Sequence, residues 1–560
     1  MGAKKVIALL FTVLELTFAQ ELNSNSFPDD FLFGVATASY QTEGAWNESD
    51  KSESIWDSLT HNHPELIRDG SSGDVASDSF HHINDDVQRI KDLGVNFYQF
   101  SISWTRLLPE SYSNRVSEEG LRYYNNLIDA LIAANITPMI TLYHWDLPSQ
   151  LQKLGGWVNP LLVDYFGDYA EVAFRNFGDR VKYWITFYEP SEVCDAYGSS
   201  NKAPTNVAQP GIGEYLCVDT ILKAHARAYH IYDNGYRSDD DIAGSIGIAL
   251  AVGWNEPNST APEDVAAANK AMQFTAGIFA HPIFSNDGDY PEIVKTTVAN
   301  RSALEGLPYS RLPELTEEEK RYIQGSSDFL GITHYSTSMV AAKENDPIGE
   351  PSKDKDLSVL SWFDTANWEG SASSSLWVVP SGFRKALLWL DNEYGYPIYV
   401  TGNGYSDLGE IEDDRRINYY QTYLSALLDA IYDGNANIQA YTVRSLMDNF
   451  EWLDGYVNRF GIYHVNMSDP ARPRTIKKSG NFIKQVITTR RVTTSDDSSG
   501  GSDGGSSGGG SDGGSSGGGS DGGSSGGGSD GGSSDNSSGL RVIALPLSLL
   551  LLLTSTLALS

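Results

Sequence analysis

The chain has 560 residues, which is enough for more than one domain, although a single α/β barrel can also occupy most of such a length. Its formal net charge is −33 at pH 7, which argues against a nucleic acid or an anionic membrane surface as a partner, because both require basic patches. The acidity favours solubility, and the 12 Trp and 30 Tyr residues are compatible with either a sugar-binding cleft or a large aromatic core.

The first 19 residues have the features of a secretory signal peptide. Lys4 and Lys5 precede an apolar run that ends at the small residue Ala19, a pattern typical of a cleaved signal. Six N-x-S/T sequons agree with passage through the secretory pathway and predict glycosylation. Their acceptors are Asn47, Asn135, Asn258, Asn300, Asn466 and Asn536.

Residues 25–489 show no linker-like change in composition, so we expect one domain there. Eight short apolar runs are typical of buried strands; they begin at Phe31, Val95, Pro138, Tyr183, Ser245, Asp328, Pro397 and Ile438. Amphipathic segments such as 118–136 lie between them, with apolar residues at helical spacing. The alternation predicts a single (β/α)8 TIM barrel, in which functional groups lie where the strands end. His144, Glu189, Tyr335 and Gly402 lie at such ends.

The C-terminal region has two parts of different composition. Residues 490–539 form a low-complexity Gly/Ser/Asp linker that repeats with a period of nine, and roughly 40 flexible residues of this kind reach about 35 Å. Residues 540–560 form a hydrophobic tail with no charge beyond Arg541, which indicates either a GPI-anchor signal or a single-pass membrane helix. Both alternatives predict a protein attached to the extracellular face of the cell surface.

Cys194 and Cys217 are the only cysteines, and in a secreted chain they could close a disulfide, which their spacing alone does not establish. The histidine pair His81 and His82 is the nearest approach to a metal cluster, but it lacks a spaced set of further ligands. The sequence also contains no phosphate-binding glycine loop within the fold. We therefore expect neither a metal nor a cofactor.

Several long motifs occur in one order: FPDDFLFGVATASYQTEGAWNES, FSISWTRLLP, TLYHWDLP, WITFYEP, VTGNG and SLMDNFEWLDGYVNRFGIYHV. Through them the chain resembles glycoside hydrolase family 1, the β-glucosidase and lactase family, from Phe27 to about Ile487. The resemblance implies a TIM barrel and a retaining mechanism with two glutamates about 5–5.5 Å apart. The glutamate of the T-x-N-E-P motif protonates the leaving oxygen, and that of T-E-N-G attacks the anomeric carbon.

The catalytic pair that the resemblance implies is incomplete. Glu189 matches the acid/base position, but Gly402 stands where the nucleophile belongs. Four further positions of the innermost sugar subsite depart from the family pattern: Gln99 replaces an arginine, Tyr188 and Thr333 replace asparagines, and Arg444 replaces a tryptophan. The change at Gln99 fits the change at Gly402, because an arginine without its carboxylate partner would be a desolvated charge that costs several kcal/mol.

Other positions that contact sugar in the family are retained: Gln41, His144, Tyr335, Glu451 and Trp452. Arg444 has two possible roles. It either helps to accommodate an anion or pairs with Glu189 or Glu451 and seals the pocket, and we expect the pairing.

The main hypothesis is therefore a family 1 barrel that has lost retaining hydrolysis and binds a β-linked glycan, a glycoside or a protein ligand, similar in this respect to the klotho proteins. One alternative is an enzyme with a modified mechanism that uses Glu189; this needs a second carboxylate, for which Asp407 and Glu410 are nearest in sequence. Another alternative is a structural spacer of a cell or egg surface, which would bind no ligand.

Overall fold

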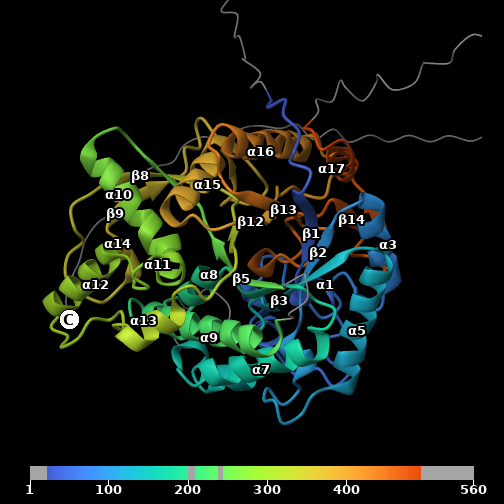
Figure 1. Cartoon of the computed structure of the whole chain (residues 1–560), viewed down its shortest axis with the longest axis horizontal. Helices are drawn as coiled ribbons and strands as arrows, with labels where there is room; N and C mark the ends of the chain where they lie inside the picture. Colours follow the sequence, from blue (N-terminus) through green and yellow to red (C-terminus); the bar gives the residue numbers. More distant parts are fainter. Residues whose placement is uncertain (1–21, 200–207, 238–243, 493–560) are drawn as a thin grey trace, which may run out of the picture. The chain divides into compact units, whose positions relative to one another are not determined.

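The computed structural model describes residues 22–199, 208–237 and 244–492 (Figure 1). The predicted signal peptide, most of the linker, the C-terminal tail and Asn536 lie outside the described residues. The folded region continues to Val492, slightly beyond the boundary predicted at residue 489. Arg490 explains the difference, because its backbone oxygen accepts a hydrogen bond from the Phe27 nitrogen at 2.8 Å and its guanidinium donates to the oxygen of Phe31.

Eight parallel strands close into a barrel in the order β1-β13-β12-β7-β5-β4-β3-β2, which confirms the predicted (β/α)8 fold. These strands are β1 (Leu32–Thr37), β2 (Phe97–Ser101), β3 (Thr137–Tyr143), β4 (Tyr183–Tyr188), β5 (Ser245–Ala251), β7 (Leu330–Thr333), β12 (Ile398–Asn403) and β13 (Ile438–Arg444). Each falls within one of the eight runs named from the sequence, or begins one residue before it. In the register of β12 against β7, Gly402 lies opposite Thr333.

Helices surround the barrel, as Figure 1 shows. The longer ones are α3 (Ile83–Leu93), α5 (Glu118–Ala133), α7 (Leu162–Phe177), α9 (Gly213–Gly235), α10 (Pro262–Met272), α12 (Glu292–Leu304), α15 (Pro380–Tyr394), α16 (Asp414–Tyr432) and α17 (Lys478–Thr489). Shorter helices lie in the connections: α1 (Ser39–Thr42), α2 (Ile55–Asn62), α4 (Trp104–Leu107), α6 (Ser149–Lys153), α8 (Pro190–Asp195), α11 (Ile278–Phe284), α13 (Glu317–Ile323) and α14 (Lys353–Leu357).

The helix predicted at 118–136 illustrates how the sequence sets these elements. Ser117 caps α5 by accepting a hydrogen bond from the Gly120 nitrogen at 3.0 Å. Tyr124, Ile128 and Leu131 recur on one face and are fully buried. The helix thus begins at a polar cap and is held by an apolar stripe against the barrel.

The barrel interior is filled by side chains from alternate strand positions. Phe97, Met139, Ile185, Phe329 and Tyr399 belong to this inner cluster. Gln99 lies two residues after Phe97 on β2 and therefore faces the same interior, where it is 2% exposed.

Short strands that the sequence did not predict follow the ends of the barrel strands. They are β6 (Trp254–Pro257), β8 (Thr337–Ala342) and β9 (Val359–Trp362) in one sheet, β10 (Glu369–Gly370) with β11 (Trp377–Val378), and β14 (Tyr463–Val465) with β15 (Arg474–Ile476). Strands this short carry too little sequence periodicity to be predicted. They matter here because the connections after the barrel strands build the walls of the site.

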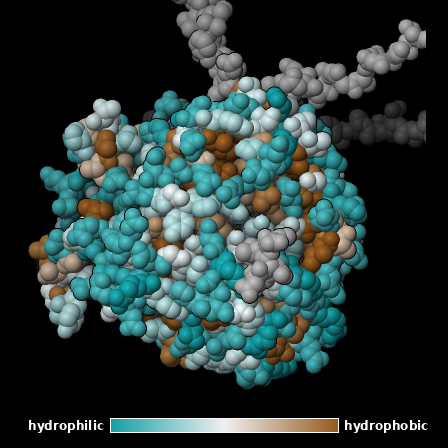
Figure 2. Space-filling model, viewed as in Figure 1, coloured by the Kyte–Doolittle hydropathy of each residue, from teal (hydrophilic) through white to brown (hydrophobic). Residues whose placement is uncertain are grey.

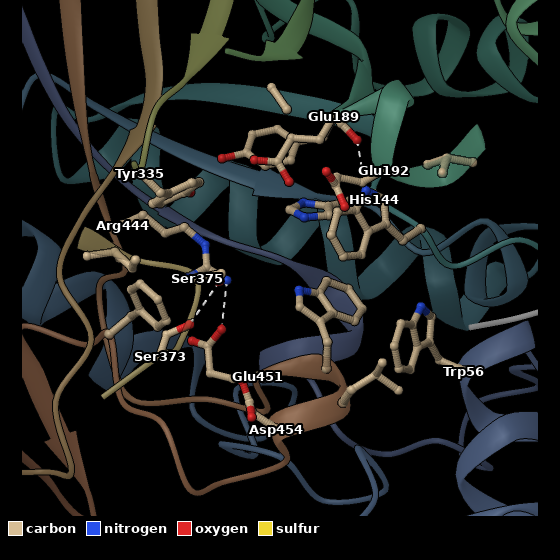
Figure 3. Close-up of a pocket in the computed structure, with 18 of the residues that line it drawn as sticks. Trp56, His144, Glu189, Glu192, Tyr335, Ser373, Ser375, Arg444, Glu451 and Asp454 are labelled. Atoms are coloured by element: carbon tan, nitrogen blue, oxygen red, sulfur yellow. Dashed lines mark hydrogen bonds and ion pairs between the residues drawn. The ribbon is translucent and has the colours of Figure 1, made fainter. Parts of the chain in front are cut away.

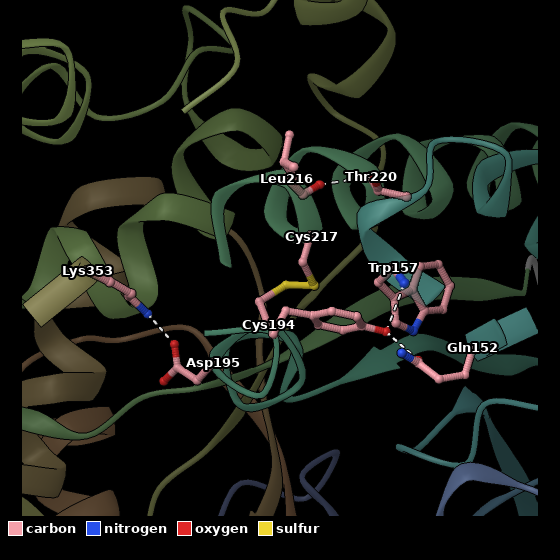
Figure 4. The surroundings of a disulfide bond; sticks show 9 residues. Gln152, Trp157, Cys194, Asp195, Leu216, Cys217, Thr220 and Lys353 are labelled. Carbon is pink, nitrogen blue, oxygen red and sulfur yellow. Dashed lines mark hydrogen bonds and ion pairs between the residues drawn. A yellow bond between two sulfur atoms is a disulfide. The ribbon is translucent and has the colours of Figure 1, made fainter. Parts of the chain in front are cut away.

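Cys194 and Cys217 form a disulfide with a Cα–Cα distance of 5.3 Å (Figure 4). It joins α8 to α9. Asp195, next to Cys194, accepts a hydrogen bond from the Lys353 ammonium at 2.6 Å. Because α8 begins directly after Glu189, these two links fix the segment that follows this residue.

The face seen in Figure 2 is mostly hydrophilic, with scattered apolar residues. Within the described ranges, no helix is long and apolar enough to cross a membrane. The sequon residues that the structure describes are accessible: Asn47, Asn135, Asn258 and Asn300 are exposed and Asn466 is half-buried. Glycosylation at these positions stays a prediction.

Candidate functional site

A cavity of about 490 Å³ lies where the strands of the barrel end (Figure 3). Seven of the predicted site residues line it: His144, Tyr188, Glu189, Tyr335, Arg444, Glu451 and Trp452. Gln41 and Gly402 do not, although each contacts a residue that does. In Figure 3, Arg444 and Tyr335 lie on one side of the cavity and Trp56 on the other, with Glu189 and Glu451 at opposite edges.

Glu189 is held in a fixed position at the end of β4. Its backbone is left-handed, with φ of 51°, and its nitrogen donates to the Ala249 oxygen at 2.7 Å. A non-glycine residue in this conformation is uncommon and occurs often at functional sites. The hydroxyl of Thr333 donates to Oε1 at 2.5 Å. Thr333 therefore orients the carboxyl group.

Burial raises the pKa of Glu189 from 4.5 to about 7, although the hydrogen bond from Thr333 opposes the rise. The side chain lines the cavity while the residue is only 8% exposed. A carboxyl group with such a pKa exists in both protonation states near neutral pH. Glu189 is thus able to donate or accept a proton.

The space next to Gly402 is filled by Tyr188. A Cβ atom at position 402 would lie 2.2 Å from the Tyr188 Oη and 3.0 Å from the Tyr335 Oη. Tyr188 is 2% exposed; its Oη donates to the Thr401 oxygen at 3.3 Å, and its ring stacks on His144 with centroids 4.2 Å apart. The tyrosine hydroxyl therefore occupies the volume in which a glutamate side chain at 402 would begin.

On β2, Gln99 places a neutral amide in the barrel interior. It is buried in the barrel interior, and its Oε1 has no hydrogen-bond partner among the described residues. A charged arginine there would need a carboxylate partner, and Gly402 supplies none. The residues at 99, 188 and 402 thus fit one another.

Arg444 pairs with Glu451. Its Nη2 donates to the Glu451 Oε2 at 2.9 Å and to the Gln41 Oε1 at 3.4 Å, and its guanidinium lies over the ring of Phe460 at 4.7 Å. Burial raises the pKa of Glu451, while Arg444 opposes the rise. Of the two expected partners the structure selects Glu451. The expectation that this pairing seals the pocket is wrong, because the cavity stays open beside the pair.

The positions that the resemblance predicts to contact a sugar are engaged within the protein in part. The Gln41 Nε2 donates to the Phe450 oxygen at 2.7 Å, to the Asn449 Oδ1 at 3.1 Å and to Glu451. Burial, together with the charge of Arg444, lowers the pKa of His144 well below its ordinary value, so this imidazole is neutral. The Glu451 Oε1 and the Tyr335 Oη have no hydrogen-bond partner among the described residues, so not every polar group at the cavity is engaged within the protein.

An aromatic wall, which we had not predicted, faces the polar groups. Trp452 lies 4.6 Å from Trp145 and 4.7 Å from Trp56 between ring centroids. The Trp145 Nε1 donates to the backbone oxygen of Tyr188 at 2.9 Å. Further lining residues that sequence reasoning missed are Ile55, Tyr143, Glu192, Val193, Ala251, Ser373, Ser375, Leu376, Leu453, Asp454 and Phe460. Trp145 could have been identified as a site residue from the sequence, because it directly follows His144 in the motif TLYHWDLP.

The second carboxylate considered for a modified mechanism is not in the cavity. The Asp407 Oδ2 lies 2.6 Å from the Arg416 Nη2, and neither Asp407 nor Glu410 lines the site. The described residues contain no group of three or more His, Cys, Asp or Glu side chains that could hold a metal ion. His81 instead contacts Asp78, at 2.6 Å.

The fold and the site define a (β/α)8 barrel with a cavity at its strand ends that the carboxyl group of Glu189 lines. Residues 23–492 match the model of glycosyl hydrolase family 1, and the chain belongs to that family. It is 45% identical over 465 residues to myrosinase 1 of Brevicoryne brassicae, covering 83% of this chain and 98% of that protein. It is 42% identical to the human lactase-like protein, covering 82% of each chain.

Solved structures agree with the sequence relatives. An aphid myrosinase structure superposes with a TM-score of 0.79 at 44% identity and covers 83% of this chain and all of that one. A rice β-glucosidase structure gives a TM-score of 0.77 at 36% identity, covering 83% and 99% of the two chains.

Proposed function

We propose that this protein is a ligand-binding member of glycosyl hydrolase family 1 that does not carry out retaining hydrolysis. One observation carries the proposal: Gly402 stands at the nucleophile position, and the hydroxyl of Tyr188 fills the space that a carboxylate there would need. In a retaining reaction the nucleophile captures the sugar covalently and divides one difficult step into two easier ones. Without that group, Glu189 alone does not replace the pathway.

No other carboxylate in the cavity is a plausible replacement. Glu451 is paired with Arg444, and Glu192 lies three residues after Glu189 on the same segment. Asp454 accepts from the Asn458 Nδ2 at 2.8 Å, and its side chain is 41% exposed. Strand β12, which carries the nucleophile in the family pattern, presents none of the carboxylates that line the cavity.

Tyr188 is not a surrogate nucleophile either. Its Oη bonds to the Thr401 oxygen, and burial raises the pKa of the phenol well above its ordinary value. A phenol that stays protonated at neutral pH is a weak nucleophile. Tyr188 therefore fills space and shapes the cavity.

The relatives and the cavity support the proposed ligand class. Proteins described as β-glucosidases are similar over nearly the whole barrel, which supports a β-glycoside or a glycan as the ligand. A cavity of about 490 Å³ is of the size that binds small molecules. The predicted signal peptide, linker and tail support a place at the extracellular face of the cell surface, where a protein ligand is the alternative partner.

A second candidate function is an enzyme with a modified mechanism, and the raised pKa of Glu189 favours it, because such a group is suited to proton transfer. The two functions are separated by assaying the wild type and Glu189→Gln on aryl β-glycosides. We expect no release of the aryl group above the buffer rate from either protein. Release by the wild type that disappears in Glu189→Gln would overturn the proposal and support the second function.

A further inference from the structure

We propose that the open edge of strand β9 binds an extended, basic segment of a protein partner, which adds to the small sheet beside it as a fourth strand. Strand β9 (Val359–Trp362) is an outer strand of the sheet β6-β8-β9, in the connection between barrel strand β7 and helix α15 (Figure 1). None of its residues lines the cavity. The proposal is therefore independent of the ligand and the chemistry proposed for the cavity.

The first feature is the edge itself. Strand β9 pairs antiparallel with β8, with Trp362 opposite Met339. Outside this ladder, Leu360, Ser361 and Trp362 make no further backbone hydrogen bond to a described residue. An unpaired strand edge presents backbone donors and acceptors to which another chain can add a strand. The strand also contains no lysine or proline, the residues that commonly protect such edges.

The second feature is the exposed apolar pair Leu360 and Trp362. These residues are two apart in an extended strand, so both side chains point to one face of the sheet. Helix α10 packs against the other face, where Val340 clusters with its alanines and Val359 packs against them. Leu360 is 50% exposed and Trp362 is 40% exposed. The edge therefore offers two apolar contacts at the spacing of alternate residues in an added strand.

The third feature is local negative charge. Residues 334–379, which form the connection that carries β9, contain seven Asp or Glu residues and three Lys residues. Two of the lysines, Lys343 and Lys353, are already in ion pairs. Four of the acidic residues have no ion-pair partner among the described residues; they are Glu344, Glu350, Asp354 and Asp364. The surroundings of β9 thus favour a basic segment and oppose a second copy of this chain, whose net charge is −33.

These three features specify the partner's segment. Its backbone continues the ladder of β9, and apolar side chains two residues apart cover Leu360 and Trp362. Lysine or arginine residues between and beyond them meet the surrounding carboxylates. In strand addition of this kind, the backbone hydrogen bonds supply affinity and the alternate side chains supply specificity.

The test uses the full-length protein and three fluorescently labelled peptides, whose binding is followed by anisotropy. KTVKVTK has two valines at the required spacing and three lysines. ETVEVTE has the same valines with glutamates in place of the lysines, and the third peptide is KTVKVTK with N-methyl groups on its central residues. We expect saturable binding of KTVKVTK and at least about tenfold weaker binding of the other two, because one lacks the complementary charge and the other lacks the backbone donors.

Two variants and a matched control locate the binding site. Leu360→Ser and Trp362→Ser are each expected to weaken the binding of KTVKVTK about fivefold or more, as the loss of a cross-strand apolar contact does. Leu304→Ser is the control, because this leucine is 68% exposed at the end of helix α12, and it should leave binding unchanged. Amide hydrogen exchange gives a second readout that needs no variant, since bound peptide should slow exchange in β9.

Three peptide results would overturn the inference: no saturable binding of KTVKVTK up to about 1 mM, equal binding of either control peptide, or unchanged binding in both Leu360→Ser and Trp362→Ser. A wild-type dimer in sedimentation velocity that Leu360→Ser abolishes would also overturn it, because the edge would then belong to a second copy of the chain. None of these results depends on hydrolysis, so the proposed function is tested separately.

Discussion

The fit between Tyr188 and Gly402 leads to a prediction about stability. In Gly402→Ala the new Cβ would lie 2.2 Å from the Tyr188 Oη, closer than real Cβ contacts allow. The tyrosine does not move away freely, because its ring stacks on His144. Overpacking a closed interior in this way costs about 1–3 kcal/mol, and we expect that loss of unfolding free energy.

Removing the hydroxyl should relieve the clash. Tyr188→Phe alone loses one weak hydrogen bond to the Thr401 oxygen, at a cost of about 0.5–1.5 kcal/mol. The double variant Gly402→Ala with Tyr188→Phe should therefore be more stable than the sum of the single losses predicts, by at least about 1 kcal/mol. Part of the strain would remain, because the Tyr335 Oη still lies 3.0 Å from the new carbon.

The assay is denaturant unfolding of the four proteins of this double-mutant cycle. Gly349→Ala is the matched control, because a Cβ there meets nothing within 4 Å, and it should leave the unfolding free energy nearly unchanged. Additive losses, within about 0.5 kcal/mol, would show that the two residues do not compete for one volume and would refute the reasoning.

Three further predictions concern other parts of the site. Because burial raises the pKa of Glu189 to about 7, the free energy of unfolding of the wild type should fall by about 3 kcal/mol relative to that of Glu189→Gln as the pH rises from below 4.5 to above 7. A constant difference across that range, measured by denaturant unfolding, would contradict the assigned pKa. Arg444→Met leaves Glu451 as a buried charge without its partner and should lower the free energy of unfolding by about 3–5 kcal/mol at neutral pH. Most of this loss should be recovered when Glu451→Gln is added. No recovery in the double variant would show that the ionic contact is not the cause. Replacing Cys194 and Cys217 by serine opens a loop with a sequence separation of 23 and should cost roughly 3 kcal/mol, seen as a lower melting temperature; an unchanged melting temperature would mean that the bond adds no stability.

The barrel could be predicted from the sequence because its strands are continuous apolar runs and its helices carry a regular apolar stripe. The run from Pro397 became β12, and the segment at 118–136 became α5. The short strands that follow the barrel strands, such as β10 and β11, escaped prediction because two residues carry no periodicity. The boundary at residue 489 was also too early, since the contacts of Arg490 with the first strand region are long-range.

The site was predicted only in part. The departures from the family motif identified Tyr188 and Gly402 one at a time, but no sequence pattern shows that one hydroxyl occupies the other residue's space. The choice of Glu451 as the partner of Arg444 likewise depends on distances between separate loops. Trp56 was missed for the same reason, because it comes from the connection after β1 and meets Trp452 only in the folded barrel.

The central claim is that no group in this cavity captures a sugar covalently, and intact-mass measurement tests it most directly. The wild type and a variant with Gly402→Glu, Tyr188→Asn and Gln99→Arg would each be incubated with 2,4-dinitrophenyl 2-deoxy-2-fluoro-β-glucoside, which accumulates the covalent intermediate of a retaining enzyme. We predict an unchanged mass for the wild type, while an added fluoroglucosyl group in the variant would show that the rest of the site is competent. A fluoroglucosyl adduct on the wild type, at Tyr188 or at any carboxylate of the cavity, would contradict the account.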